Sequence, residues 1–229
     1  MIRHEINCRA QASKGFSLVE LLIALAVTVI FMYAIYFLYV SSVQAFKITD
    51  WKQQRTAQAQ MFWDLLRTPL EEANLHIVPD SSGVSVILNT VARPLILKET
   101  VSADTITAVN ILEWSVDHFD PVAESVETAA FKLYVKANKL FLDGGRFSNK
   151  IVLEDVNEVK AKATKIFQRD EAGAFEEFIA DTAAVGDVEV GNIIEITIVL
   201  KPRSGIGPKN LKLIQSCKFR VETTVTTLP

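Results

Sequence analysis

Two groups of residues in this 229-residue sequence combine side chains that could do chemistry. His118 follows Asp117 and stands two residues before Asp120, and a histidine flanked by carboxylates is a common general base. The segment Gly205-Ile206-Gly207-Pro208-Lys209 resembles a phosphate-binding loop, in which backbone N–H groups cradle an anion. The first group would indicate an acid–base enzyme and the second a nucleotide-binding protein.

Neither group has the neighbours that its chemistry needs. No GxSxG nucleophile elbow or reactive cysteine accompanies His118, so a polar loop is the favoured interpretation. The segment from Gly205 to Lys209 lacks both the third glycine and the Lys-Ser/Thr ending of a phosphate loop, and it predicts a loop between two strands.

A metal site is not indicated either. Five acidic residues gather late in the chain, but their spacing is not that of an EF-hand and predicts a solvated loop. These residues are Asp170, Glu171, Glu176, Glu177 and Asp181. We therefore expect no catalytic residue, no metal and no cofactor, and the chain is not predicted to be an enzyme.

The composition excludes further classes of protein. The net charge of −3 gives no basic surface for nucleic acid, and two cysteines exclude a disulfide scaffold and a cysteine-rich zinc domain. Seven prolines and nine glycines are too few for low-complexity or collagen-like sequence. Cys217 is expected to pack as a small apolar residue at the start of the last strand.

One long apolar segment dominates the N-terminal part. Of the 25 residues from Phe16 to Val40, 22 are apolar, and the 20 from Leu21 to Val40 include no charge and one polar residue, Thr28. A helix of about 20 apolar residues crosses a bilayer core, so this segment predicts a transmembrane helix. Three tyrosines spaced by three form a stripe at its far end, as in an aromatic belt. They are Tyr33, Tyr36 and Tyr39.

Two rival interpretations of this segment are weaker. The rest of the chain is too short to bury it as a core helix, and a cleaved secretory signal has a shorter apolar run of about 7–15 residues. Lys and Arg flank both ends, so charge alone does not set the orientation. The short leader and the C-terminal domain of over 150 residues favour a cytoplasmic N-terminus.

Glu20 is the unusual residue of the apolar segment. A carboxylate a few positions inside an apolar helix is costly in lipid and suggests a function with a charged partner. The alternative is a carboxylate at the helix N-terminus, which reaches the interface and is favoured by the helix dipole. Taken alone, Glu20 fits this alternative better.

The residues around Glu20 change that interpretation. The string Lys14-Gly15-Phe16-Ser17-Leu18-Val19-Glu20, followed by the apolar helix, resembles the prepilin signal of the type IV filament superfamily. The resemblance implies that a prepilin peptidase cuts between Gly15 and Phe16 on the cytoplasmic face and that the new Phe16 amine is N-methylated. It also implies that Glu20 neutralises such an amine, usually on a neighbouring subunit during assembly. Cleavage would remove Cys8 and leave Cys217 as the one cysteine.

The helix is predicted to continue beyond the membrane. No Gly or Pro occurs from Phe16 to Thr68, so Pro69 is the first breaker of a helix of roughly 50 residues, on the order of 80 Å. Three i,i+4 pairs predict a face that packs on a sheet: Ala57/Met61, Met61/Leu65 and Phe62/Leu66. A polar surface is expected from Lys47, Asp50, Lys52, Gln53, Gln54 and Arg55.

After Pro79, alternating apolar and polar residues predict antiparallel strands, with Ala137-Asn138 as a hairpin turn. The predicted strands lie at about 84–88, 105–114, 131–136, 139–142, 159–167, 194–200 and from 219 to the end. The expected fold is therefore α+β, a long N-terminal helix packed on an antiparallel β-sheet, and it is type IV pilin-like. The expected parts are a cleaved leader (1–15), a transmembrane and filament-core helix (16–40), its amphipathic continuation (41–75) and a periplasmic β-rich domain (76–229).

A weaker resemblance concerns the rest of the chain. The helix end at Trp63-Asp64-Leu65-Leu66-Arg67 and the segment Val152-Leu153-Glu154-Asp155-Val156 before a strand look like those of PilW-like minor pilins and J-type (GspJ-like) pseudopilins. Major pilins commonly have a Gly or Pro in the membrane half of the helix, and this sequence has neither, which favours a minor subunit.

The resemblances imply a structural subunit that initiates, primes or caps a type IV pilus or a type II secretion pseudopilus. The implied partners are a prepilin peptidase, other minor pilins or pseudopilins, a major pilin and the inner-membrane assembly platform. The implied location is the bacterial inner membrane with a periplasmic domain, and then the filament, at its tip. A signal-anchored periplasmic binding or adhesin domain outside any filament stays open as the alternative. The residues do not distinguish pilus, secretion and competence machines.

Overall fold

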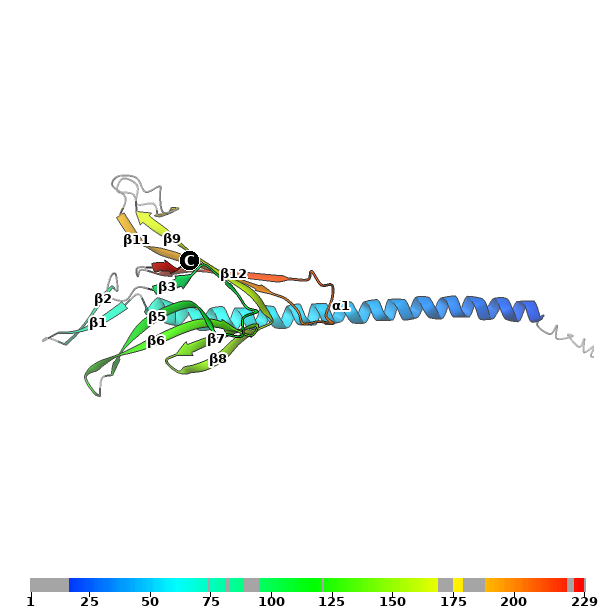
Figure 1. Ribbon diagram of the computed structural model, residues 1–229, viewed down its shortest axis with the longest axis horizontal. Helices are drawn as coiled ribbons and strands as arrows, with labels where there is room; N and C mark the ends of the chain where they lie inside the picture. The colour runs from blue at the N-terminus through cyan, green and yellow to red at the C-terminus, as the bar shows by residue number, and fades with distance from the viewer. Residues whose placement is uncertain are drawn as a thin grey trace, which may run out of the picture. The chain divides into compact units, whose positions relative to one another are not determined.

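The computed structural model describes residues 17–73, 75–80, 83–88, 95–120, 122–168, 175–178, 188–221 and 225–228 (Figure 1). The chain divides into two compact units, Met1–Phe46 and Lys47–Pro229. The first unit contains the apolar part of the long helix α1 (Leu18–Glu72), and the second contains the rest of α1 and all the strands. This layout confirms the predicted α+β fold, with one long N-terminal helix packed on an antiparallel-rich β-structure.

The expectation that Pro69 breaks the helix is wrong. Pro69 does not break α1, which continues through Glu72. A proline inside a helix removes the backbone hydrogen bond to residue i−4, whereas the proline carbonyl remains available as an acceptor. The buried indole N–H of Trp114 donates to the Pro69 carbonyl at 3.1 Å, and the N–H of Ala73 donates to the same carbonyl at 3.1 Å.

One face of α1 in the second unit is buried in the core. Its members follow one another at intervals of three, four or eight residues: Trp51, Ala59, Phe62, Leu66, Leu70 and Ala73. The predicted pair Phe62/Leu66 is confirmed, since both side chains are buried. The pairs through Met61 are wrong, because Met61 is 66% exposed and lies on the opposite side of the helix.

The described residues after the helix form three sheets. β1 (Leu75–Asp80) and β2 (Gly83–Leu88) form a two-stranded sheet. The six-stranded sheet has the order β13-β3-β5-β6-β7-β8, with bounds Val225–Leu228, Leu95–Lys98, Val109–Asp120, Ser125–Lys136, Lys139–Gly144 and Phe147–Glu154. The third sheet has the order β10-β9-β11-β12, with bounds Phe175–Phe178, Val156–Gln168, Val188–Leu200 and Leu213–Val221, and β4 (Thr100–Ser102) pairs with β9. The second half of α1 runs along both large sheets in Figure 1 and contributes to their common core.

The predicted hairpin at Ala137-Asn138 is confirmed. Both residues have positive φ, 48° and 60°, as a two-residue type I′ turn requires. β6 and β7 then pair antiparallel from Lys136↔Lys139 to Lys132↔Asp143. Phe131, Leu133 and Val135 are buried while Lys132 and Lys136 are exposed, as their alternation predicts.

Other strand predictions need correction. The strand expected at 105–114 begins at Val109 and continues to Asp120 as β5. The prediction missed β1, β3, β4, β8 and β10. It also expected only antiparallel pairing, whereas β13 runs parallel to β3, with Val225 opposite Leu95. Cys217 lies in the middle of β12 and not at the start of a last strand, but it does pack, half-buried, against the core.

Candidate functional site

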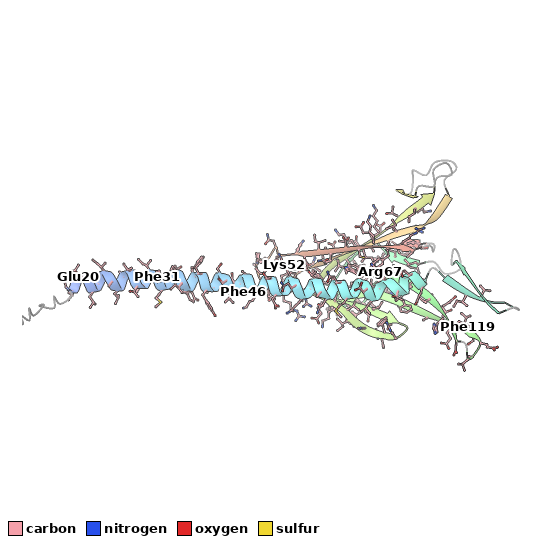
Figure 2. The ribbon with its side chains drawn as sticks, turned by 180° about the vertical axis from the view of Figure 1, so that it is seen from behind. Glu20, Phe31, Phe46, Lys52, Arg67 and Phe119 are labelled. Atoms are coloured by element: carbon pink, nitrogen blue, oxygen red, sulfur yellow. The ribbon has the colours of Figure 1, made fainter. Side chains whose placement is uncertain are left out.

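The predicted processing residues Gly15 and Phe16 lie outside the described residues. Glu20 lies in the first turn of α1, which begins at Leu18. In Figure 2, Glu20 and Phe31 mark the apolar part of the helix, from which side chains project outward on all sides. The described part of the site is therefore the first turn of α1 and the apolar helix that follows it.

Ser17 and Glu20 form a reciprocal cap at the start of α1. The Ser17 N–H donates to the Glu20 carboxylate at 2.9 Å, and the Glu20 N–H donates to the Ser17 hydroxyl at 3.2 Å. This arrangement is a capping box, which satisfies two backbone donors that no helical carbonyl can reach. The negative charge also lies at the positive end of the helix dipole. The spacing Ser-x-x-Glu in the sequence is the signal that could have predicted this contact.

The helix after Glu20 is suited to an apolar environment. Within the described part of the chain, α1 is the one helix long and apolar enough to cross a membrane. Its large side chains from Leu18 to Tyr39 are exposed in the isolated chain. Its one interior polar side chain, Thr28, donates to the Ala24 carbonyl at 2.7 Å and so needs no partner outside the helix. The apolar surface is therefore available to lipid or to other helices.

Comparison with known proteins decides what kind of N-terminus this is. Residues 11–36 match the family described as "Prokaryotic N-terminal methylation motif". The N-terminal segment of the chain is therefore similar to that of type IV prepilins. The matched residues include Gly15, Phe16 and Glu20, together with most of the apolar segment. Neither a curated protein nor a solved structure matches the chain.

The matched motif indicates how this N-terminus is processed and used. The methylation motif implies a substrate of a prepilin peptidase and a context of filament assembly. The apolar helix fits the single-pass membrane anchor of such a protein. Proteins of this kind are structural subunits.

A buried polar network in the second unit was missed by the sequence interpretation. The Asp155 carboxylate, 4% exposed, accepts hydrogen bonds from the Trp51 indole N–H at 3.0 Å and from Nε of Arg55 at 2.9 Å. On its other side, Nε of Arg203 donates to the carboxylate at 3.1 Å. Asp155 has a positive φ of 60°, and its carbonyl accepts from the Lys201 N–H at 2.8 Å. One carboxylate thus joins α1, the β8–β9 corner and the segment after β11.

This network corrects the interpretation of Arg55. The side chain was assigned to a polar outer surface, but it is only 11% exposed and faces the β-structure. The reason is its partner: a guanidinium is buried where a carboxylate pairs with it. Trp51 and Arg55 lie four residues apart on one helix face, and this spacing is the one signal in the sequence that points to the network.

Glu154, beside Asp155, is surrounded by several positive charges. Its pKa is lowered mainly by the hydrogen bond from Lys139, and burial, the next largest effect, opposes this; the positive charges of Lys139, Arg55 and Arg203 lower it further. Nζ of Lys139 lies 3.1 Å from the Glu154 carboxylate. The carboxylate is therefore held in its charged form by the groups around it.

The remaining candidates lie in different surroundings. His118 is not in a polar loop: it lies in β5 opposite Glu127 of β6, because these strands pair continuously up to Asp120. Its side chain is exposed and lines a hollow of about 890 Å³ next to the C-terminal part of α1. Asp117 is bonded elsewhere, since it accepts from the Ile77 N–H and the Thr128 hydroxyl. The structure therefore does not assemble the three residues into an acid–base centre.

The glycine-rich segment is a loop between two strands, as predicted, because residues 201–212 connect β11 to β12. Of the acidic group, Asp170, Glu171 and Asp181 lie outside the described residues, while Glu176 and Glu177 belong to β10 and not to a loop. Among the described residues, no three His, Cys, Asp or Glu side chains converge as a metal site would require.

Proposed function

We propose that this type IV prepilin-like chain is a minor pilin or minor pseudopilin, a structural subunit that initiates, primes or caps a type IV pilus or a type II secretion pseudopilus. The observation that carries the proposal is the methylation motif at residues 11–36, followed by a helix with an exposed apolar surface. The lack of Gly and Pro from Phe16 to Thr68 favours the minor role, because major pilins commonly interrupt this half of the helix.

In this proposal, a prepilin peptidase cleaves between Gly15 and Phe16, and the new Phe16 amine is methylated. Residues 1–15 are the leader, 16–40 the membrane and filament-core helix, 41–75 its continuation and 76–229 the periplasmic domain. The chain waits in the bacterial inner membrane with its N-terminus in the cytoplasm. It then moves through the assembly platform into the filament, at its tip, where it contacts other minor subunits and the major pilin.

The assembly step depends on Glu20. A cationic amine among packed apolar helices is costly unless a carboxylate pairs with it. Glu20 is bonded within its own chain by the Ser17 N–H, so its carboxylate is satisfied before any partner arrives. A neighbouring Phe16 amine adds a full positive charge to that site, so that donor and acceptor are both charged, whereas the backbone N–H of Ser17 is a neutral donor.

Crosslinking in native membranes, followed by purification of the chain, tests this function. The proposal predicts crosslinks to other pilin-like subunits and to the assembly platform. A chain that crosslinks to none of them, in cells that assemble filaments, would contradict the proposal. That result would favour a signal-anchored binding or adhesin domain.

A further inference from the structure

The loop between β11 and β12, residues 201–212, carries an unbalanced charge. It contains four cations and no acidic residue, in a chain whose net charge is −3. The cations are Lys201, Arg203, Lys209 and Lys212. A local excess of positive charge on an acidic protein indicates an anionic partner for this surface.

The loop is held against α1 by close packing. Gly207 has a positive φ of 67°, and a Cβ at this position would lie 2.9 Å from the side chain of Ile48. Ile206 and Leu211 are half-buried against the core, and the Leu211 N–H donates to the Pro208 carbonyl at 3.0 Å. The loop therefore packs closely on Ile48, and hydrogen bonds within the loop stabilise its conformation.

Three of the four cations are available to a partner. Arg203 is engaged by Asp155 and Glu154, but Lys201, Lys209 and Lys212 are exposed and form no ion pair with any described residue. Lys47 of α1 is also exposed and lines a shallow hollow with the first part of the loop. The nearest acidic group on that stretch of helix, Asp50, accepts a hydrogen bond from Gln54.

A short length of chain connects the part of α1 that contacts this loop to the end of the apolar segment. Ile48, on which the loop packs, follows Val40 by eight positions, which correspond to about 12 Å of helix. Lipid headgroups extend several Å beyond the hydrocarbon core, and charges interact over a Debye length of about 8–10 Å. The short connection therefore limits how far the loop can lie from the headgroups.

We propose that Lys201, Lys209 and Lys212 bind the anionic headgroups of the bilayer in which α1 is anchored. This inference rests on the membrane-anchored state in the proposed function. Anionic lipids attract basic segments next to a membrane helix, and each Lys adds to the attraction. The contact orients the second unit on the membrane surface before assembly and is given up when the subunit leaves the bilayer.

Amine labelling of the full chain in vesicles tests the contact. The chain is reconstituted in vesicles of phosphatidylglycerol mixed with phosphatidylcholine and in vesicles of phosphatidylcholine alone, and the labelling rate of each lysine is read by mass spectrometry. We expect Lys201, Lys209 and Lys212 to be labelled at least about threefold more slowly in the anionic vesicles, with the difference lost at high salt. Lys132 and Lys162, exposed on β6 and β9, are the internal controls and are expected to keep equal rates in both vesicles.

A double variant tests whether charge is the cause. In Lys209→Gln/Lys212→Gln, we expect the labelling rate of Lys201 in the anionic vesicles to approach its labelling rate in vesicles of phosphatidylcholine alone. Labelling rates of the three loop lysines that are equal in the two kinds of vesicle would overturn the lipid contact. If these equal rates are also slower than those of Lys132 and Lys162, the loop lysines are shielded by protein and not by lipid. Flotation with vesicles separates the two proposals: a chain that floats but shows equal rates loses only the lipid contact, whereas one that does not float contradicts the membrane anchor as well.

Discussion

The Ser17 N–H donates a hydrogen bond to the Glu20 carboxylate at 2.9 Å, and the Glu20 N–H returns one to the Ser17 hydroxyl at 3.2 Å. This relationship gives Glu20 two separable roles. Its oxygen atoms complete a helix cap in the isolated chain, and its charge is available for the amine of a neighbouring subunit in the proposed assembly. A variant that keeps the acceptor and removes the charge distinguishes these roles.

Glu20→Gln is that variant. The glutamine carbonyl still accepts from the Ser17 N–H, so the cap is kept while the charge is lost. We expect filament or tip incorporation to fall at least about tenfold, as in Glu20→Ala, because the amine stays unpaired in both. The measurement is the ratio of assembled to membrane-retained subunit. If Glu20→Gln assembles like the unmodified chain and only Glu20→Ala fails, Glu20 acts as a cap and the pairing proposal is wrong.

Trp114→Phe tests what holds the end of α1. The substitution keeps an aromatic ring against Phe131, whose ring centroid is 5.4 Å away, but removes the indole donor to the Pro69 carbonyl. We expect a loss of about 1–2 kcal/mol in the free energy of unfolding, measured by denaturant titration of the full chain in detergent. Tyr134→Phe, which removes an exposed hydrogen bond to Asn149, is the matched control and should change stability by less than about 0.5 kcal/mol. Equal effects of the two variants would contradict the role of the indole.

Asp155 is expected to be the most sensitive polar residue of the second unit. Asp155→Ala leaves Arg55 buried without its carboxylate, and we expect a loss of about 3–5 kcal/mol in the free energy of unfolding. Asparagine tolerates the positive φ, so Asp155→Asn removes the charge and keeps the backbone conformation. We expect it to lose most of the free energy of unfolding that Asp155→Ala loses. The control is Glu71→Gln, on an exposed part of α1.

Fluorescence of the tryptophans during denaturation measures both Asp155 variants, since Trp51 itself contacts Asp155. A stability close to that of the unmodified chain in Asp155→Asn would mean that the hydrogen bonds, and not the charge, hold the network.

The lowered pKa of Glu154 predicts a specific dependence on pH. Because the folded state holds the charged carboxylate, Glu154 contributes stability above its ordinary pKa, and this contribution is lost as the pH falls through the lower folded value. Lys139→Met removes the main cause of the lowered pKa. We expect the difference in stability between the unmodified chain and Lys139→Met to shrink from about pH 6 to about pH 3. A difference that stays constant over this range would show that Lys139 acts through packing.

The local patterns of the sequence predicted the elements, and contacts between distant residues decided where they end and what they bury. Alternation in Phe131, Leu133 and Val135 was enough to predict β6, because burial on one face of a strand is a local property. The continuation of α1 through Pro69 depends on Trp114, 45 residues later in the chain.

The same reason explains the errors in the candidate sites. Arg55 looked like a surface residue because its partner, Asp155, is 100 positions away. His118 looked like a loop residue because the polar string around it hides the pairing of β5 with β6. The Ser17–Glu20 cap, in contrast, is local, and its Ser-x-x-Glu spacing was present in the sequence throughout.

Processing of this chain as a prepilin is tested by the mass of the chain after co-expression with a prepilin peptidase. We expect loss of residues 1–15, a new N-terminus at Phe16 carrying a methyl group, and no processing of Gly15→Leu. Glu71→Gln, far from the leader, should be processed normally. An unprocessed chain in the presence of an active peptidase, or normal loss of the leader in Gly15→Leu, would show that this chain is not processed as a prepilin at this site.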